Sequence, residues 1–295
     1  MAGALCRFNR GPLTEQPSKI HSNENRILRK LDVLPAVPMV VQEILEVLNK
    51  RDASVSDVSN ALARDPGLTG RLVAASNAAF FSGFRPIYTI EEAVMRLGLN
   101  RVRTTALAVL IGTRFNPRRC PPFNTKYYWF EAMKAADCAN KLAKLLPLGG
   151  VGHAAYLCGL LHNIGLLVNA YAFPEPMQKV LEAKLDRPAL SLAELERQHL
   201  GFDHHQSGAE LLRRWRMPAA VVAAVEHYPD PESATEFKML VRLTQFAVTW
   251  AQSSFRVRPS TRLAIAEDKL RSVGESCQRE RDQMETLAFM LCSAA

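Results

Sequence analysis

The sequence predicts an all-α fold, and three observations support this. Apolar residues recur every three or four positions along most of the chain, which is the spacing of one face of a helix. Capping residues, prolines and glycines interrupt these runs at intervals typical of helix ends. Convincing runs of alternating β-branched residues, the signal for strands, are absent from the sequence. We therefore expect helical bundles throughout.

Length and composition are those of a globular chain with a sizeable core. The chain has 295 residues, of which 48% are hydrophobic and 22% charged, and this suits one large or two small domains. Its 15 glycines and 17 prolines follow no triplet period, which excludes a collagen-like chain. The longest apolar runs, such as residues 106–111, are shorter than the roughly 18 residues of a membrane helix. We expect no association with a membrane.

The cysteines and the N-terminus indicate a reducing compartment. The six cysteines form no C-x-x-C pair, and the N-terminus lacks the apolar core of a secretory signal. We expect a cytoplasmic protein with free thiols. Cys138 and Cys158 lie in apolar helical patterns, where a thiol usually packs as a small hydrophobe, so we assign them no chemistry.

We expect a flexible lead-in over residues 1–27 and an N-terminal helical subdomain over residues 28–120. Four helix starts are expected, at Pro38, at Ser54 with Asp57, at Asp65 with Pro66, and at Thr89 with Glu92. Gly98 predicts a left-handed stop, after which a helix should run from Arg101 to Thr113. Prolines at 117, 121 and 122 then interrupt the pattern and set the boundary.

A second helical subdomain is expected over residues 121–253. Its helices should begin near residue 125 and then occupy residues 153–170, 176–185, 191–199, 203–215, 218–227 and 236–253. A helical tail over 254–295 follows, with amphipathic stretches at 263–273 and 284–291. Because the charges of this tail nearly cancel, we expect it to pack on the body rather than to bind nucleic acid.

Positive charge is unevenly distributed in this chain of net charge +8. No acidic residue lies between Glu92 and Glu131, and residues 96–126 form a basic stretch. Its cations are Arg96, Arg101, Arg103, Arg114, Arg118, Arg119 and Lys126. A surface of this kind can bind phosphate, but aromatic residues do not alternate with the charges as they do in stacking platforms. Solvated helix faces are therefore the favoured interpretation, and nucleic acid is not the expected partner.

Most of the histidines lie in the second half of the chain. Three positions stand out: His162, the pair His204 and His205, and His227. Imidazoles from several helices can build a metal cluster inside a bundle. Any one of them can equally cap a carbonyl or line a polar seam, which is the more common role of a single buried histidine.

Six segments occur in the order seen in one bacterial family. They are LPAVP at 34–38, DPGLT at 65–69, ASNAA at 75–79, the stretch 90–98, GLLHNIG at 159–165, and 208–218 followed by His227. Over about residues 31–252 the chain thereby resembles the bacterial HDOD domain, and the last two segments resemble the wider HD phosphohydrolase superfamily. The resemblance implies a helical bundle followed by a half that is similar to an HD hydrolase.

The resemblance also implies where an HD active site would fall. Active members use a histidine, then an adjacent His-Asp pair, then a distant aspartate. Here these positions hold Glu131, His162 with Asn163, and Gln245, so that three of the four have changed. The additional histidines of two-metal members match His204, or its neighbour His205, and His227.

The chemistry of these changes argues against hydrolysis. HD hydrolases hold divalent cations that lower the pKa of a bound water and absorb charge on the phosphoryl oxygens. Asn163 and Gln245 offer only neutral oxygens, whereas hard cations prefer carboxylates. We expect no catalytic residue, no cofactor and a vestigial hydrogen-bonded site. A single divalent metal held by Glu131, His162, His204 and His227 is the alternative.

Three functions follow. The family resemblance implies a non-catalytic signal-transduction output module that binds partner proteins, and this is the function we expect. The first alternative is a metal-dependent phosphohydrolase acting on a nucleotide or cyclic dinucleotide. The second is a nucleic-acid or nucleotide binder that uses residues 96–126, although Arg101 and Arg103 alone form no groove-reading motif.

Overall fold

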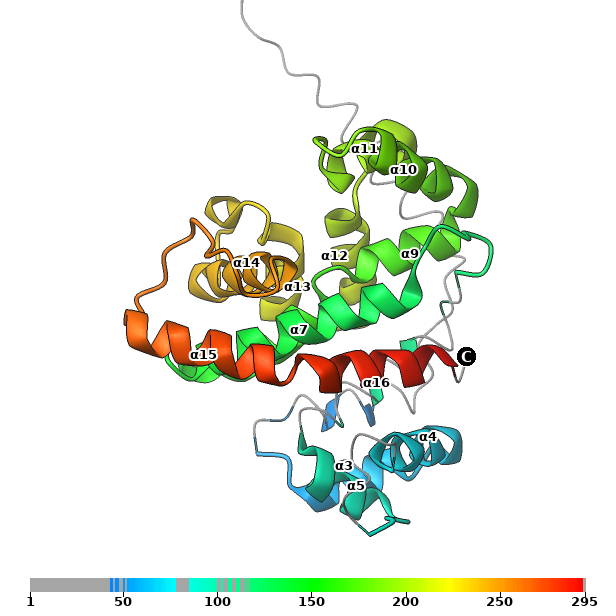
Figure 1. Cartoon of the computed structure of the whole chain (residues 1–295), viewed down its shortest axis with the longest axis vertical. Helices are drawn as coiled ribbons and strands as arrows, with labels where there is room; N and C mark the ends of the chain where they lie inside the picture. Colours follow the sequence, from blue (N-terminus) through cyan, green and yellow to red (C-terminus); the bar gives the residue numbers. More distant parts are fainter. Residues whose placement is uncertain are drawn as a thin grey trace, which may run out of the picture.

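The computed structural model describes residues 52–77, 85–99 and 117–293, together with single positions between residues 43 and 115. All the regular secondary structure in these residues is helical, which confirms the predicted all-α class (Figure 1). The lead-in over 1–27 lies outside the described residues. So do most of the helices predicted from Pro38 and from Arg101, although the positions described within them, such as Ile44 and Ala106, are helical.

Three short helices form the described part of the N-terminal region. They are α3 (Val55–Leu62), α4 (Pro66–Ser76) and α5 (Ile90–Leu97), and they lie together at the bottom of Figure 1. The predicted capping boxes at Ser54 and Thr89 are both present, each closed by the carboxylate three residues later. The predicted start at Asp65 is also confirmed, because its side chain accepts a hydrogen bond from the Leu68 amide at 3.0 Å.

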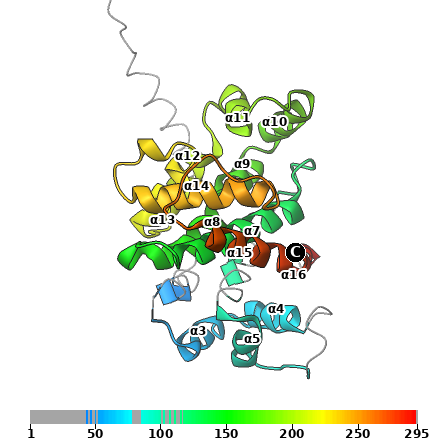
Figure 2. The same cartoon turned by 60° about the vertical axis from the view of Figure 1, so that its left-hand side comes forward.

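The C-terminal region is built around α7 (Thr125–Ala143). The helices that complete the bundle are α8 (Ala155–Leu161), α9 (Ile164–Ala172), α12 (His204–Arg214), α13 (Ala219–His227) and α14 (Lys238–Gln252). Two further helices, α10 (Pro174–Asp186) and α11 (Leu192–Leu200), lie at the end of the molecule opposite the N-terminal helices (Figures 1 and 2). Short 3₁₀ turns occupy Gly149–Ala154 and Pro231–Ser233.

The single helix predicted over residues 153–170 is wrong. The chain forms the first 3₁₀ turn, then α8, and breaks at His162 and Asn163 before α9 begins. At the break Asn163 has φ −113° and ψ 20°, and the His162 ring turns back to the carbonyl of Gly159 at 2.7 Å. Apolar residues continue at helical spacing across both sides of the break, so periodicity alone does not reveal it.

Two glycines bring helix backbones into contact at this break. A Cβ atom at Gly159 would lie 2.6 Å from the carbonyl oxygen of Ala135 in α7. A Cβ atom at Gly165 would lie 1.9 Å from the carbonyl oxygen of His204 in α12. Both distances are far inside van der Waals contact, so only glycine fits either position. The two contacts fix α8 against α7 and α9 against α12.

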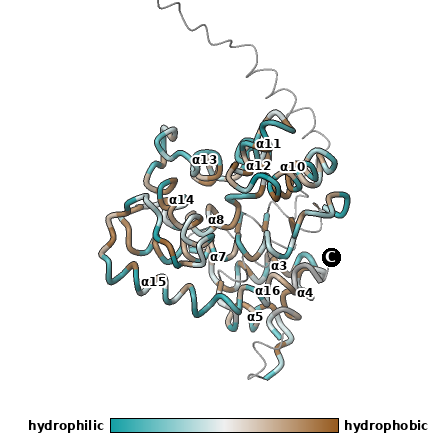
Figure 3. Tube along the Cα trace, turned by 45° about the horizontal axis from the view of Figure 1, so that its top comes forward, coloured by the Kyte–Doolittle hydropathy of each residue, from teal (hydrophilic) through white to brown (hydrophobic). Residues whose placement is uncertain are grey.

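The tail packs on the body, as predicted. Its helices α15 (Glu267–Arg279) and α16 (Arg281–Ser293) lie along α7 (Figure 1). Lys141 of α7 is ion-paired with Glu280 at 2.8 Å, and Gly274 of α15 lies against the ring of Trp250. Much of α15 is hydrophilic, as expected of a helix on the surface (Figure 3).

The most apolar stretch of the chain is internal. By length and composition the stretch Gly149–Ala172 is apolar enough to cross a membrane, but 78% of its most apolar window is buried inside the protein. This stretch contains α8 and α9, which pack on α7 and α12. Its apolarity is therefore that of a core segment.

The contact at Gly165 predicts that a glycine-to-alanine substitution is far more destabilising there than at an open position. We expect Gly165→Ala to lower the free energy of unfolding by about 3 kcal/mol, because α9 and α12 must separate to admit the methyl group. The control is Gly70→Ala in α4, where an added Cβ meets no atom within 4 Å. It should be neutral or stabilising by up to about 1 kcal/mol, because alanine favours helix. Urea unfolding measures both, and equal effects would contradict the packing argument.

Candidate functional site

Three imidazoles and one phenol meet where α8, α12 and α13 end or begin. His162 follows α8, His204 and His205 are the first two residues of α12, and Tyr228 follows α13. The rings of His204 and His205 are in contact, with centroids 3.9 Å apart and planes tilted by 46°. The Tyr228 ring makes edge contacts with His205 at 4.9 Å and with His162 at 5.5 Å. We call these four residues the histidine cluster.

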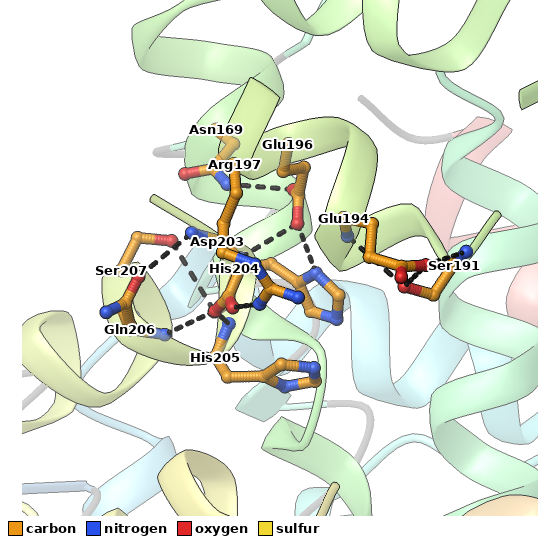
Figure 4. A network of polar contacts seen from close by, with 10 residues as sticks. All are labelled: Asn169, Ser191, Glu194, Glu196, Arg197, Asp203, His204, His205, Gln206 and Ser207. Carbon is orange, nitrogen blue, oxygen red and sulfur yellow. Dashed lines mark hydrogen bonds and ion pairs between the residues drawn. The ribbon is translucent and has the colours of Figure 1, made fainter. Parts of the chain in front are cut away.

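The start of α12 is held firmly in place. The Asp203 side chain accepts hydrogen bonds from the backbone amides of His205 and Gln206, at 3.0 and 3.1 Å. The Gln206 side chain in turn accepts from the Asp203 amide, and Arg197 of α11 is ion-paired with Asp203 (Figure 4). This capping box fixes the position of both histidines.

A buried carboxylate lies behind His204. Glu196 of α11 is 0% exposed, and its Oε2 accepts hydrogen bonds from Nδ1 of His204 at 2.5 Å and from the His204 amide at 2.9 Å. Its Oε1 accepts from the side-chain amide of Asn169 in α9 at 2.9 Å (Figure 4). Glu196 therefore connects α11, α9 and α12 through one charged group, which needs such partners to be buried.

The environment separates the pKa values of the three histidines. Burial alone lowers the pKa of His204, but the Glu196 carboxylate outweighs it and raises that pKa above its usual value. Burial lowers the pKa of His162 to about 4, and burial followed by the neighbouring His204 lowers that of His205 to about 2. His204 is thus the charged member beside two neutral imidazoles. Since Nδ1 of His162 donates to the Gly159 carbonyl, its Nε2 is left as an acceptor.

Glu131 has a different partner. Its carboxylate is 2.8 Å from the ammonium group of Lys134, one turn further along α7. That lysine is only 2% exposed, donates to the carbonyl of Ala251 at 2.9 Å, and lies 4.8 Å from the centre of the Phe130 ring. The negative charge of Glu131 is therefore already balanced by a buried cation.

The remaining sequence-predicted residues are only partly brought together. His227 is hydrogen-bonded through Nδ1 to the Ser233 hydroxyl at 3.0 Å. Gln245 donates to the carbonyl of Pro229 at 3.1 Å and accepts from the Thr261 hydroxyl. The structure thus gathers His162, His204 and His205, while Glu131, His227 and Gln245 each have other partners. Asn163 is buried at the start of α9, and its Oδ1 has no hydrogen-bond partner among the described residues.

These residues do not fit a two-cation centre. Two divalent ions close together need carboxylates to offset their repulsion. The buried carboxylates of Glu196 and Asp203 are already paired with His204 and Arg197, and the partly buried Glu131 is paired with Lys134. Within the part of the chain that the structure describes, no group of three or more His, Cys, Asp or Glu side chains is placed to hold a metal.

The predicted basic surface is partly used for internal contacts. Arg96 donates to the carbonyl of Arg85 at 2.5 Å and lies 3.4 Å from the side-chain oxygen of Asn77. Arg119 is ion-paired with Glu175 at 3.0 Å. Arg118 lies on the exposed loop before α7, whereas Arg101, Arg103 and Arg114 lie outside the described residues. The charge of Arg119 is thus already paired within the protein.

Sequence reasoning missed Glu196, Asn169 and Lys134. One signal for Glu196 was available, because it lies four residues after Leu192 and four before Leu200, on the apolar stripe of α11. A charged residue in an apolar stripe indicates a buried partner. The identity of that partner depends on how α11 and α12 pack, which the sequence pattern does not give.

The contacts of Glu196 predict that removal of its charge alone strongly destabilises the protein. Glu196→Gln removes the charge while preserving shape, and we expect the free energy of unfolding to fall by roughly 3 kcal/mol, because a buried ion pair is broken. The matched control is Glu194→Gln on the same helix, where glutamine preserves the capping box with Ser191. That variant should have nearly unchanged stability in urea unfolding.

The same variant also predicts a pH dependence. A histidine with a raised pKa contributes stability that is fully present below its unfolded value of 6.5 and is lost as the pH rises through its folded pKa. The difference in stability between wild type and Glu196→Gln should therefore be larger at pH 6 than at pH 9. A difference that grows with pH would contradict the assignment of His204 as the charged partner.

Comparisons with known proteins identify the family and the fold. The sequence model of the HDOD domain matches residues 34–231. An uncharacterised protein of Treponema pallidum (strain Nichols) is 28% identical over 222 residues, which are 75% of this chain and 42% of that protein. The chain thus spans less than half the length of this relative.

Solved structures share the fold. A protein of Marinobacter aquaeolei VT8, provisionally named a signal transduction protein, aligns with a TM-score of 0.79 at 23% identity, over 93% of this chain and 65% of that one. A provisionally named phosphohydrolase of Shewanella amazonensis SB2B aligns with a TM-score of 0.70 at 25% identity, over 90% and 97% of the two chains. An HDOD domain protein of unknown function from Geobacter sulfurreducens gives 0.64 at 21% identity, over 92% and 93%. With its family match covering more than half of its length, the chain belongs to the HDOD domain family.

Proposed function

We propose that this protein is a non-catalytic signal-transduction output module that acts by binding partner proteins in the cytoplasm of a bacterium. It works without a cofactor, and its remnant of the HD site, centred on the histidine cluster, serves to hold the helices together. The provisional names of two structural neighbours support a regulatory protein related to the HD phosphohydrolases. Two parts of this description are our proposal: that the protein does not catalyse a reaction, and that it binds a partner protein.

The observation that carries the proposal is the charge balance of the HD positions. A hydrolase needs carboxylates that are free to bind cations, because these ions activate the attacking water. Here Asn163 and Gln245 are neutral amides, and the one carboxylate, Glu131, is paired with the buried ammonium of Lys134 at 2.8 Å. Introducing a divalent cation beside that ammonium would bring like charges together.

The N-terminal helices offer a surface for a partner. Tyr88 and Met95 are 81% and 71% exposed, and they lie before and within α5. Large exposed apolar side chains of this kind are enriched at protein interfaces, where aromatic residues contribute much of the binding free energy. We propose that these two residues contact the partner.

A phosphohydrolase is the second candidate, and one observation favours it. His162 and His204 each have Nδ1 hydrogen-bonded, to a carbonyl and to a carboxylate. Metal-binding histidines are usually held in this way, with Nε2 left for the ion. A single divalent cation would then rely on neutral imidazoles, but the charge on His204 opposes it.

Hydrolysis assays separate the two candidates. We expect protein purified from manganese-supplemented cells to contain far less than one metal ion per chain, because the carboxylates are already paired. It should hydrolyse cyclic dinucleotides and a chromogenic phosphodiester no faster than the His162→Ala variant does. Hydrolysis by wild type that His162→Ala abolishes would establish the second candidate instead.

Partner binding has its own test. A host protein that co-purifies with the chain would be identified, expressed and titrated against three forms of it. We expect the double variant Tyr88→Ala, Met95→Ala to bind at least tenfold more weakly than wild type, because it loses the exposed apolar contacts. The control is Leu185→Ala, which removes an equally exposed apolar side chain on α10. Equal weakening by both changes would argue against this surface.

A further inference from the structure

Two cysteines far apart in the sequence lie against each other between the body and the tail. Cys138 is on α7 and Cys277 is on α15, and both are fully buried. The two thiols are neighbours, and each influences the other electrostatically. The Cys277 sulfur also donates to a carboxylate oxygen of Asp137, the neighbour of Cys138, at 3.5 Å. The helices α7 and α15 pack directly on one another.

Polar groups of both signs surround this pair, and Lys141 is the one that favours a thiolate. The ammonium group of Lys141 lies 2.7 Å from the Asp137 carboxylate and 2.8 Å from that of Glu280. It also interacts with both sulfurs, and a nearby cation stabilises a thiolate. Lys141, Asp137 and Glu280 are each partly exposed, so the pair lies just beneath the surface.

We propose that Cys138 and Cys277 form a redox-active pair, which a low-molecular-weight disulfide such as oxidised glutathione converts into a disulfide joining α15 to α7. The modification joins two neighbouring thiols on helices that already pack together, and Cys277 already contacts Asp137, the residue before Cys138. The disulfide changes how the tail is attached to the body. The tail is held on α7 by ion pairs in the reduced protein and by a covalent bond in the oxidised one.

The reaction proceeds by two exchanges. The Cys277 thiol loses its proton, and its thiolate attacks one sulfur of oxidised glutathione, breaking that disulfide and releasing one glutathione thiolate. The Cys138 thiolate then attacks the Cys277 sulfur of the mixed disulfide and releases the second glutathione. The two cysteines lose two protons and two electrons, and the oxidant becomes two thiols.

Cys277 is the residue that reacts first. Burial, followed by the contact with Cys277, raises the pKa of the Cys138 thiol well above its usual range, so Cys138 is the poorer initial nucleophile. Cys277 lies on a tail helix that follows an exposed linker, and lifting of α15 opens it to the oxidant. Forming the mixed disulfide in turn brings an activated sulfur to Cys138.

The experiment uses the whole protein in folded form. It is equilibrated with mixtures of oxidised and reduced glutathione, free thiols are blocked, and the chain is digested with trypsin for mass spectrometry. We expect peptide 135–141 joined to peptide 272–279, two hydrogen atoms lighter than the separate peptides. Oxidation should also raise the midpoint of thermal unfolding by about 5 °C.

Matched variants make the result specific. Cys158→Ala, which alters another buried thiol, should retain the cross-link, whereas Cys277→Ala should lose it and the rise in midpoint. Circular dichroism checks that both variants are folded, and wild type alone still gives a decisive result. A cross-link that forms only in urea would overturn the proposal. So would oxidised protein that carries only glutathione adducts or pairs of other cysteines.

Discussion

The contact between the backbones of α9 and α12 is the constraint on which the rest of the C-terminal region depends. Gly165 brings α9 to the carbonyl of His204, and Gly159 brings α8 to α7 in the same way. The chain between these glycines is therefore trapped between two helices, and His162 and Asn163 lie in that segment. The position of His162 in the histidine cluster is therefore set by two glycines, whose lack of a Cβ atom lets the helix backbones touch, rather than by the histidines themselves.

The pairing of the nearby carboxylates then determines whether the site can bind cations. Burying a carboxylate is costly unless it is paired and hydrogen-bonded. Glu196 meets that requirement through His204 and the Asn169 amide, and the partly buried Glu131 has Lys134 as its cation, although its Oε2 has no hydrogen-bond partner among the described residues. Both negative charges are thereby committed within the protein. Glu196 thereby connects α11 with α9 and α12, whereas the ion pair of Glu131 lies within α7.

Local features were predictable from the sequence, and contacts between distant segments were not. The capping boxes at Ser54 and Thr89 and the helix starts at Ser191 and Asp203 were expected, because such signals are set by residues close together in the sequence. The break at Asn163 was missed, since apolar spacing continues on both sides of it.

The candidate site follows the same rule. That His162 and His204 would come together was inferred from a family resemblance, and the structure places both in one cluster. The pairing of Glu196 with His204 and of Cys138 with Cys277 depends on how distant helices pack, which residue spacing does not give. Glu131 and Lys134 lie three residues apart on one helix, so that pair could have been predicted from spacing and was missed.

The ammonium group of Lys134 also bears on which substitutions the neighbouring positions can tolerate. Exchanging Asn163 for aspartate would give the His-Asp pair found in HD hydrolases, but it would add a buried anion without a paired cation. Lys134 would still be ion-paired with Glu131. Exchanging the lysine alone would leave Glu131 unpaired and the Ala251 carbonyl without its donor. Each of these two exchanges is therefore expected to be destabilising by itself, so the present charge balance resists single substitutions at either position.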